Sequence, residues 1–127
     1  MKAIVTDKAA PPGGHYAQGI VHEGQIYVSG QLPVRPDGTH RTADSFDDQC
    51  RQVLENVLQI VEAGGGERQG IVKATAYIVG IDNWPAFNKI FAEVFGDHKL
   101  ARAIVPVPEL HHGYLVEVEV LATVRGS

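Results

Sequence analysis

The C-terminal stretch, residues 114–124, has the clearest alternation of hydrophobic and polar positions in the chain. Its valines are Val116, Val118 and Val120, and they alternate with Glu117 and Glu119. A period of two with β-branched residues is typical of a strand that buries one face. The valines then lie on one face and both carboxylates on the other. The pattern alone favours a solvated carboxylate face over a site in which a carboxylate meets a cation.

Apolar residues at helical spacing predict a first amphipathic helix, which begins at Asp44 or Ser45 and ends at the three glycines 64–66. Ser45 and Asp48 resemble a capping box, with Asp in place of the usual Glu. The apolar stripe consists of Phe46, Cys50, Val53, Leu54, Val57, Leu58 and Val61. Cys50 lies in this stripe, so we expect a buried core thiol.

A second helix is predicted after residue 82, with Asp82 as its cap and Pro85 in its first turn. Gly96 ends it. Its expected apolar face consists of Trp84, Phe87, Ile90, Phe91, Val94 and Phe95. The spacing of these residues indicates that this helix packs against a sheet, as the first one does.

Further strands are predicted at residues 3–6, 16–22, 25–29, 71–79 and 101–107, and Glu23-Gly24 forms the turn of a hairpin. The order β-β-β-α-β-α-β-β predicts an α+β fold, in which two helices cover one face of a mixed sheet. The other face also needs a cover, and a second subunit is the simplest one. Gly30 marks either a bulge or a close approach of the backbone to another group.

Composition narrows the class of protein. The chain has 127 residues, 44% hydrophobic and 20% charged, which suits a single domain over residues 1–127. A formal net charge of -4 argues against a nucleic-acid partner. One cysteine excludes an internal disulfide, and no apolar span of about 20 residues is present to cross a membrane. We therefore expect a cytoplasmic protein.

Six histidines raise the question of a metal site: His15, His22, His40, His98, His111 and His112. No HxxxH pattern lies on a predicted helix, and no cysteine pair is present, so we expect no metal. If the segment is extended, His111 and His112 point to opposite sides. Ser29 does not lie in a nucleophile elbow. Surface or interface histidines are the expected outcome.

Arg102 lies among small and apolar residues of a predicted strand. A buried guanidinium is usually paired, because an unpaired buried charge is costly, and its fork binds carboxylates with two hydrogen bonds. Its partner is either an internal carboxylate, Glu117 or Glu119, or the carboxylate of a ligand. The residues alone leave both interpretations open.

Several blocks, in order along nearly the whole chain, resemble the RidA/YjgF family of reactive-intermediate deaminases, formerly called L-PSP endoribonuclease-like. The blocks are GHYAQG (14–19), VSGQLPV (28–34), LENV (54–57), VKAT (72–75), FN (87–88), ARA (101–103) and VEVE (116–119), together with Gln49. The resemblance implies a chorismate-mutase-like α+β subunit and a trimer whose sheets form a central barrel. It also implies substrate sites between subunits.

The activity implied by the resemblance is hydrolysis of 2-aminoacrylate and related 2-imino acids to 2-keto acids and ammonia, without a metal or organic cofactor. Arg102 then binds the substrate carboxylate, Glu117 positions or activates water, and Tyr16 completes the catalytic group. Glu119 is expected to be structural. The implied substrate-binding residues are Arg102, Ser29, Gly30, Asn88 and the backbone around Ile104.

The chain also departs from the family pattern. Ile104 replaces a cysteine of many bacterial members, His15 replaces the proline of Gly-Pro-Tyr, and the segment between His98 and Arg102 is short. A histidine at 111 further alters the cleft rim. A specialised substrate and a plain surface rim both remain open. Alternative functions are a pathway-specific deaminase of the 2-aminomuconate type and a non-enzymatic small-carboxylate-binding or chaperone-like trimer; the net charge disfavours RNA cleavage.

Overall fold

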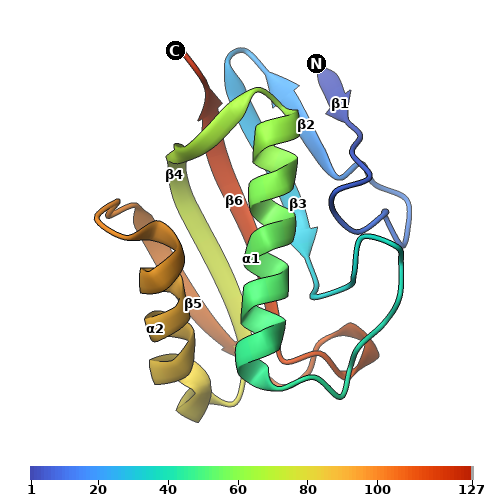
Figure 1. Cartoon of the computed structure of the whole chain (residues 1–127), viewed down its shortest axis with the longest axis vertical. Helices are drawn as coiled ribbons and strands as arrows, with labels where there is room; N and C mark the ends of the chain where they lie inside the picture. The colour runs from blue at the N-terminus through green and yellow to red at the C-terminus, as the bar shows by residue number, and fades with distance from the viewer. Residues whose placement is uncertain (127) are drawn as a thin grey trace.

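The computed structural model describes residues 1–126, in which one mixed sheet carries two α-helices on the same face (Figure 1). The strands are β1 (Lys2–Ile4), β2 (Gly19–His22), β3 (Gln25–Gln31), β4 (Gly66–Val79), β5 (Ala101–Val107) and β6 (Val116–Val124). The helices are α1 (Phe46–Ala63) and α2 (Trp84–Phe95), with short 3-10 turns η1 (Ile81–Asn83) and η2 (His111–Gly113). The predicted α+β class and the order of the elements are confirmed.

The strand order in the sheet is β1-β2-β3-β6-β4-β5. The last strand, β6, inserts between β3 and β4 and pairs antiparallel with both, whereas β4 and β5 are parallel. β6 thus joins the N-terminal hairpin to the β4–β5 pair. Its valines and the apolar residues of β3 and β4 form the core with α1 and α2. The face predicted for the valines is buried, as expected.

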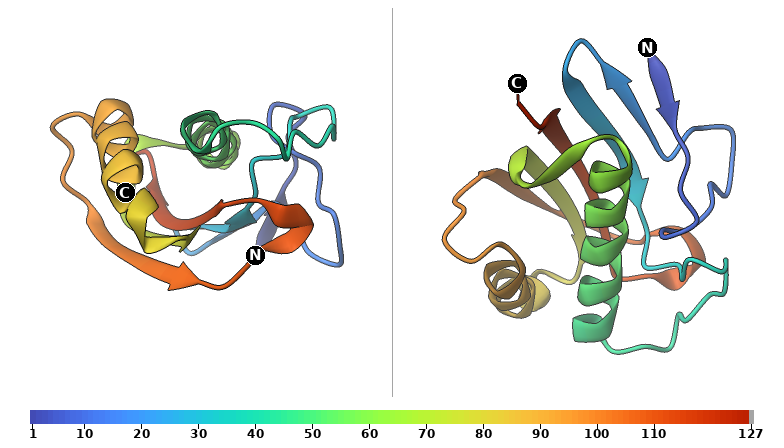
Figure 2. Two further views of the ribbon diagram at one scale, coloured as in Figure 1. Left: turned by 90° about the horizontal axis from the view of Figure 1, so that it is seen from below. Right: turned by 45° about the horizontal axis from the view of Figure 1, so that its top comes forward.

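Figure 2 shows both helices on one side of the sheet. The register pairs Tyr77 with Glu117 and Thr75 with Glu119, so the two glutamates lie on the opposite, helix-free face. Within residues 1–126, no helix covers that face, and Tyr27 exposes 45% of its surface. A large apolar side chain on an open sheet face is compatible with burial by another chain.

Local signals explain the hairpin and the first helix. Glu23 and Gly24 both have positive φ, 51° and 77°, as a two-residue type I′ turn requires. Ser45 caps α1, because its Oγ accepts a hydrogen bond from the Asp48 N–H at 3.1 Å. The Asp48 carboxylate instead faces Arg51 at 3.8 Å, so the predicted capping box is only half formed. Gly64 ends the helix, as predicted.

The second helix differs from the prediction in two respects. Asp82 does not cap it: Asp82 lies in η1, and Asn83 occupies the N-cap position without a side-chain capping bond. The Asn83 amide instead donates to the Val79 carbonyl at 2.9 Å and ties the turn to β4. Trp84 is 40% exposed and so lies at the edge of the buried face, whereas Phe87 and Ile90 are buried.

Five strands have bounds other than those predicted. β1 covers Lys2–Ile4 and not residues 3–6, and β3 continues to Gln31 and not only to residue 29. β2 begins at Gly19 and not at residue 16, because the buried Gln18 amide binds the backbone of Thr6 and Ala10 and holds the preceding segment as a loop. β4 begins at Gly66 and not at residue 71, and its pairing with β6 is irregular between Gly66 and Lys73. β6 begins at Val116, after a buried Tyr114.

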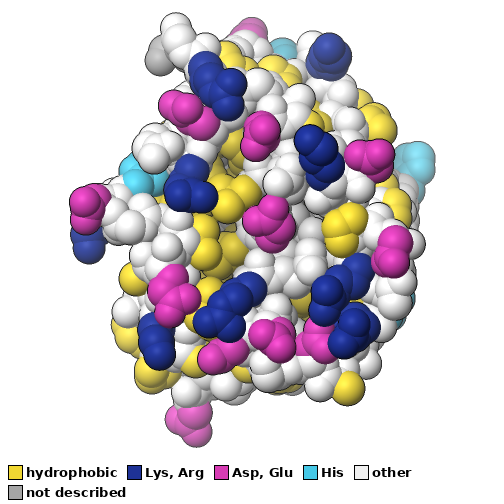
Figure 3. All heavy atoms as spheres, in the orientation of Figure 1, with side chains coloured by type: hydrophobic (Ala, Val, Ile, Leu, Met, Phe, Trp, Pro, Cys, Tyr) yellow, Lys and Arg dark blue, Asp and Glu magenta, His cyan; other side chains and the backbone are white. Residues whose placement is uncertain are grey.

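The helix-bearing face carries basic and acidic side chains that are interspersed over its surface (Figure 3). It has no basic stripe of the kind that would follow a nucleic-acid backbone. Over residues 1–126, no helix is long and apolar enough to cross a membrane.

Candidate functional site

A hollow with a volume of about 670 Å³ lies beside β3 and β6. Four residues expected at a site line it together: Tyr16, Ser29, Gly30 and Glu117. They come from the loop before β2, from the end of β3 and from the start of β6. The structure therefore brings together residues that are up to a hundred positions apart in the sequence.

Gly30 makes this hollow possible. The pairing of β3 with β6 shifts register between Val28 and Gln31, and the Glu117 carboxylate occupies the place that a Cβ at position 30 would take. The close approach predicted for Gly30 is thus confirmed, and the shift in register is of the kind that a bulge produces. A residue with a side chain would displace Glu117, since only glycine leaves room for so close an approach.

Tyr16 and Ser29 are held by backbone groups. The Tyr16 hydroxyl accepts a hydrogen bond from the Gly13 N–H at 3.0 Å, which leaves its own proton able to reach a ligand. The Ser29 hydroxyl donates to the Ala17 carbonyl at 2.6 Å, so it braces the loop and its oxygen can still accept. No base takes the proton of Ser29 in the described residues, in line with the expectation that it is not a nucleophile.

Glu117 is half-buried, and this burial raises its pKa. The charge of His111 opposes the shift, and that of Glu119 adds to it. A carboxylate with a raised pKa is a better proton acceptor than an exposed one. Glu119 has another role: its carboxylate accepts a hydrogen bond from the Tyr77 hydroxyl at 2.7 Å and thereby raises the pKa of Tyr77.

Arg102 lies in a second, smaller hollow of about 370 Å³ between α2 and β5. Its Nη1 donates to Asn88 Oδ1 at 3.0 Å, and its guanidinium carbon lies 5.0 Å from the ring centre of Phe91 and 5.8 Å from that of Trp84. Burial lowers the pKa of Arg102. No carboxylate within residues 1–126 comes within 4.0 Å of its nitrogens. The cation is oriented, and it has no counterion at ion-pair distance in the described part of the chain.

The hypothesis of an internal ion pair between Arg102 and Glu117 or Glu119 is wrong for one chain. Arg102 pairs in register with the buried Ala74 and contacts α2, so it lies on the helix-bearing face. The glutamates lie on the other face, with β4 in between. Ile104 shares the face of Arg102 and packs against the core.

Two buried polar residues of α1 were not given a role by the sequence analysis. Asn56 donates to the carbonyls of Leu32 and Val34 at 3.2 and 2.9 Å, and the Gln49 carbonyl accepts from the Leu115 N–H at 2.9 Å. They fix the segments that follow β3 and precede β6, which border the Glu117 hollow. A polar residue at a stripe position of an amphipathic helix was the signal that could have revealed them.

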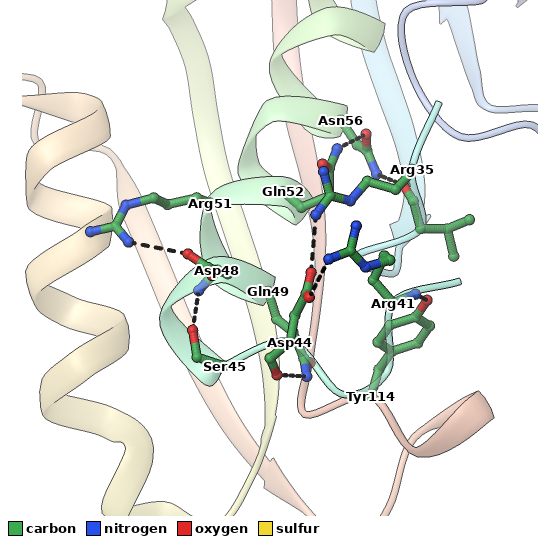
Figure 4. A network of polar contacts seen from close by, with 11 residues as sticks. Arg35, Arg41, Asp44, Ser45, Asp48, Gln49, Arg51, Gln52, Asn56 and Tyr114 are labelled. Carbon is green, nitrogen blue, oxygen red and sulfur yellow. Dashed lines mark hydrogen bonds and ion pairs between the residues drawn. The ribbon is translucent and has the colours of Figure 1, made fainter. Parts of the chain in front are cut away.

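A polar network continues along the same border (Figure 4). Asp44 accepts from Arg35 at 3.1 Å and lies 3.4 Å from Arg41. The backbone N–H of Arg41 donates to the buried Tyr114 hydroxyl at 3.2 Å. The network joins the start of α1 to the segment that enters β6.

The histidines do not form a metal centre. Over residues 1–126 there is no group of three or more His, Cys, Asp or Glu side chains placed to hold an ion. His111 and His112 do not lie in an extended segment, so the argument that their side chains point to opposite sides does not apply: both lie in η2, where His112 has φ 63°. Their rings are 6.2 Å apart and border the Glu117 hollow.

Comparison with known proteins places these residues in a family. The family model described as Endoribonuclease L-PSP matches residues 6–124. A RutC family protein of Pyrococcus horikoshii is 35% identical over 121 residues, which cover 95% of this chain and 96% of the relative. The 2-iminobutanoate/2-iminopropanoate deaminase of Salmonella typhimurium is 35% identical over 127 residues, or 98% of each chain.

Solved structures agree with this comparison. Escherichia coli TdcF with bound serine superposes with a TM-score of 0.91 at 31% identity, over 97% of this chain and 98% of that one. The agreement in sequence and in fold extends over almost the whole chain, including both hollows.

Proposed function

The chain belongs to the RidA/YjgF family, and we propose that it is an enamine/imine deaminase that hydrolyses 2-aminoacrylate and related 2-imino acids to 2-keto acids and ammonia. The observation that carries this proposal is Arg102, a partly buried guanidinium without a carboxylate partner at ion-pair distance in the described residues. Such a group favours a carboxylate ligand, which it can bind with two hydrogen bonds. The Salmonella relative, which carries the name of a deaminase, supports the same reaction.

We propose further that the protein is a homotrimer with sites between subunits. Arg102 and Glu117 lie on opposite faces of the sheet of one chain, so a site that uses both needs two chains. Rotational symmetry then repeats the same site at each interface. The exposed Tyr27 on the helix-free face supports burial of that face. A cytoplasmic location is part of the proposal, which the free, buried thiol of Cys50 suits.

The proposed chemistry needs positioning more than a strong nucleophile. A protonated 2-imino acid already has an electrophilic carbon, and Arg102 with Asn88 holds the carboxylate beside it. Glu117 accepts a proton from the attacking water, which adds to that carbon. Glu117 then passes this proton to the nitrogen, and the C–N bond breaks as the new hydroxyl group gives its proton back to Glu117, so that the ketone and ammonia leave. The proton held by Glu117 finally goes to ammonia or to water. Tyr16 donates a hydrogen bond to the oxygen or nitrogen at this carbon and keeps its proton.

Glu117 has two properties that suit this role. Burial raises its pKa, which makes it a stronger base, and the bulge at Gly30 fixes its position. Ile104 follows Arg102 by two residues in β5, so both side chains lie on the same face. Because β5 is an edge strand, the backbone around Ile104 offers hydrogen-bonding groups to the imine or the water.

The test is to generate imino acids in situ with a flavin amino-acid oxidase and to measure how fast the keto acid appears with native protein, Arg102→Ala and Arg102→Lys. Catalase removes the peroxide that the oxidase forms. We expect native protein to accelerate keto-acid release and Arg102→Ala to lose about 10²-fold or more in kcat/KM. Arg102→Lys should recover little, because lysine cannot form the bidentate contact. The absence of any acceleration by native protein would contradict the proposal.

A further inference from the structure

Three histidines border the Glu117 hollow and have no part in the proposed hydrolysis: His40, His111 and His112. The ring centres of His40 and His112 are 4.3 Å apart, and those of His111 and His112 are 6.2 Å apart. We call these three residues the histidine wall. They converge from two segments, the loop after β3 and the turn η2, on one side of one cavity.

The wall is held in place by the buried Tyr114. Its hydroxyl accepts from the Arg41 N–H at 3.2 Å and lies 3.0 Å from His40 Nδ1. Since the oxygen already accepts one hydrogen bond, its proton can be donated to Nδ1 of a neutral His40, whose Nε2–H then remains a donor. His112 has a left-handed backbone, φ 63° and ψ 6°, which is uncommon outside glycine. The turn between Leu110 and Tyr114 maintains it.

The charges around the wall are of both signs. Behind His40, the carboxylate of Asp44 faces the guanidinium groups of Arg35 and Arg41, and the Glu117 carboxylate lines the same hollow as the wall. Within the described residues, no member of the wall forms an ion pair. N–H donors that line a hollow can bind an anion through charge-assisted hydrogen bonds.

We propose that the histidine wall binds a second carboxylate, so that the preferred substrates are dicarboxylic 2-imino acids or their enamine tautomers. This inference rests on the proposed function. The 1-carboxylate would bind Arg102 of a neighbouring chain, the imine carbon would lie at Glu117, and the distal carboxylate would accept hydrogen bonds from the wall. Water adds to the imine carbon and ammonia leaves, as for a neutral imino acid. The hollow of about 670 Å³ has room for a substrate longer than 2-aminoacrylate.

The kinetic test compares two imines of equal chain length, one derived from glutamate and one from norvaline, each generated by an oxidase that accepts the parent amino acid. We expect native protein to prefer the glutamate-derived imine by about tenfold in kcat/KM, the size of one or two charge-assisted hydrogen bonds. The double variant His40→Gln/His112→Asn should abolish the preference while retaining activity on the norvaline-derived imine. Gln keeps a hydrogen bond to Tyr114, and Asn tolerates the left-handed backbone.

A binding test does not depend on turnover. The only tryptophan, Trp84, lies 5.8 Å from the Arg102 guanidinium, so its fluorescence reports a ligand there. We expect 2-oxoglutarate to bind native protein about tenfold more tightly than 2-oxopentanoate, which lacks only the distal carboxylate. The ratio should fall to about one in the double variant and stay unchanged in His22→Gln, an exposed histidine outside the hollow. Circular dichroism and thermal melts establish that each variant is folded.

The outcomes separate the two proposals. If native protein hydrolyses both imines equally and binds both keto acids equally, the histidine wall has no second-carboxylate role and the deaminase function stands. If no imine is hydrolysed but the binding preference is present and lost in the double variant, the wall stands and the deaminase function falls. A preference that survives in the double variant overturns the assignment of the second carboxylate to His40 and His112.

Discussion

The surroundings of Arg102 and Glu117 differ in a way that bears on how a site is assembled. Arg102 lies against aromatic rings and donates one hydrogen bond to Asn88, and burial lowers its pKa. Glu117 lines the hollow of about 670 Å³, and burial raises its pKa. In each case desolvation disfavours the charged form, and in neither case does an opposite charge within the described chain relieve it at ion-pair distance. Under the proposed function, each would supply one half of the substrate site.

This difference shows that the residue types alone do not tell which side chains can meet in one site. The residue types suggest a carboxylate-binding arginine and a basic glutamate, yet the sheet register places them on opposite faces. A ligand that uses both must therefore bind where two chains meet.

The largest expected effect comes from mixing two inactive subunits. Arg102→Ala removes one half-site and Glu117→Gln removes the other, so we expect each variant alone to lose about 10²-fold or more of its activity. Trimers reassembled from equal amounts of both should regain about a quarter of native activity, because one interface in four then combines an intact Arg102 with an intact Glu117. The measurement is keto-acid release before and after denaturation and mixed refolding.

Two controls make the mixing decisive. Each variant refolded alone must stay inactive, and native protein taken through the same cycle must recover its activity. If the mixture of two well-folded variants gains nothing although mixed trimers are present by mass spectrometry, the two half-sites do not work together between chains.

The second largest effect is expected on kcat when the position of Glu117 alone is disturbed. In Gly30→Ala the new methyl group would occupy the position of the Glu117 carboxylate, so the glutamate must move and we expect kcat to fall by about 10²-fold. Gly13→Ala is the matched control, because a Cβ there meets only the Tyr16 hydroxyl, at an ordinary 3.9 Å. Equal activity of both variants in the imine assay would show that the position of Glu117 does not matter.

The third effect concerns the Arg102 half. Asn88→Ala removes the 3.0 Å hydrogen bond that orients the guanidinium but leaves the charge and the aromatic rings. We expect KM to rise about tenfold with a smaller change in kcat, since one charge-assisted hydrogen bond is lost on the binding side. Asn83→Ala serves as the control for stability, because it removes a structural hydrogen bond at the N-terminus of α2, the helix that carries Asn88. A fall in kcat without a change in KM would contradict the positioning role.

Features of the fold that depend on residues close together in the sequence could be predicted. The hairpin, the start of α1 and both helix ends follow from signals within a few residues, namely Glu23-Gly24, Ser45, Gly64 and Gly96. Asp82 misled the prediction, because the extra turn η1 moves the helix start beyond it. Local signals therefore predicted the existence of the elements more accurately than their first residues.

The site was predictable only in part. Resemblance supplied Tyr16, Ser29 and Glu117, which the structure brings into one hollow. The insertion of β6 between β3 and β4 depends on pairing between distant strands, which no local pattern reports. The separation of Arg102 from Glu117 follows from that pairing, and so it could not be read from either residue.

The smallest expected effect is on stability and its pH dependence. Because the folded-state pKa of Glu117 is raised by burial, the folded state binds a proton there more tightly than the unfolded state does. Stability is thus lowered as the pH rises through the raised pKa. Glu117→Gln should remove this pH dependence and make the protein slightly more stable at pH 7, by less than about 1 kcal/mol, since the group is half-exposed and solvent screens it.

Urea unfolding of native protein and Glu117→Gln at pH 4 and pH 7 measures this difference, with Glu119→Gln as the control from the same strand face. Glu119 accepts the Tyr77 hydrogen bond at 2.7 Å, so its replacement should lower stability instead. The two replacements would then change stability in opposite directions. The Glu117 carboxylate lowers the stability of the fold and is a stronger base, whereas the Glu119 carboxylate raises the stability. If Glu117→Gln destabilised the fold as much as Glu119→Gln, Glu117 would be a structural residue of β6, and the half-site on this face would lose its proposed base.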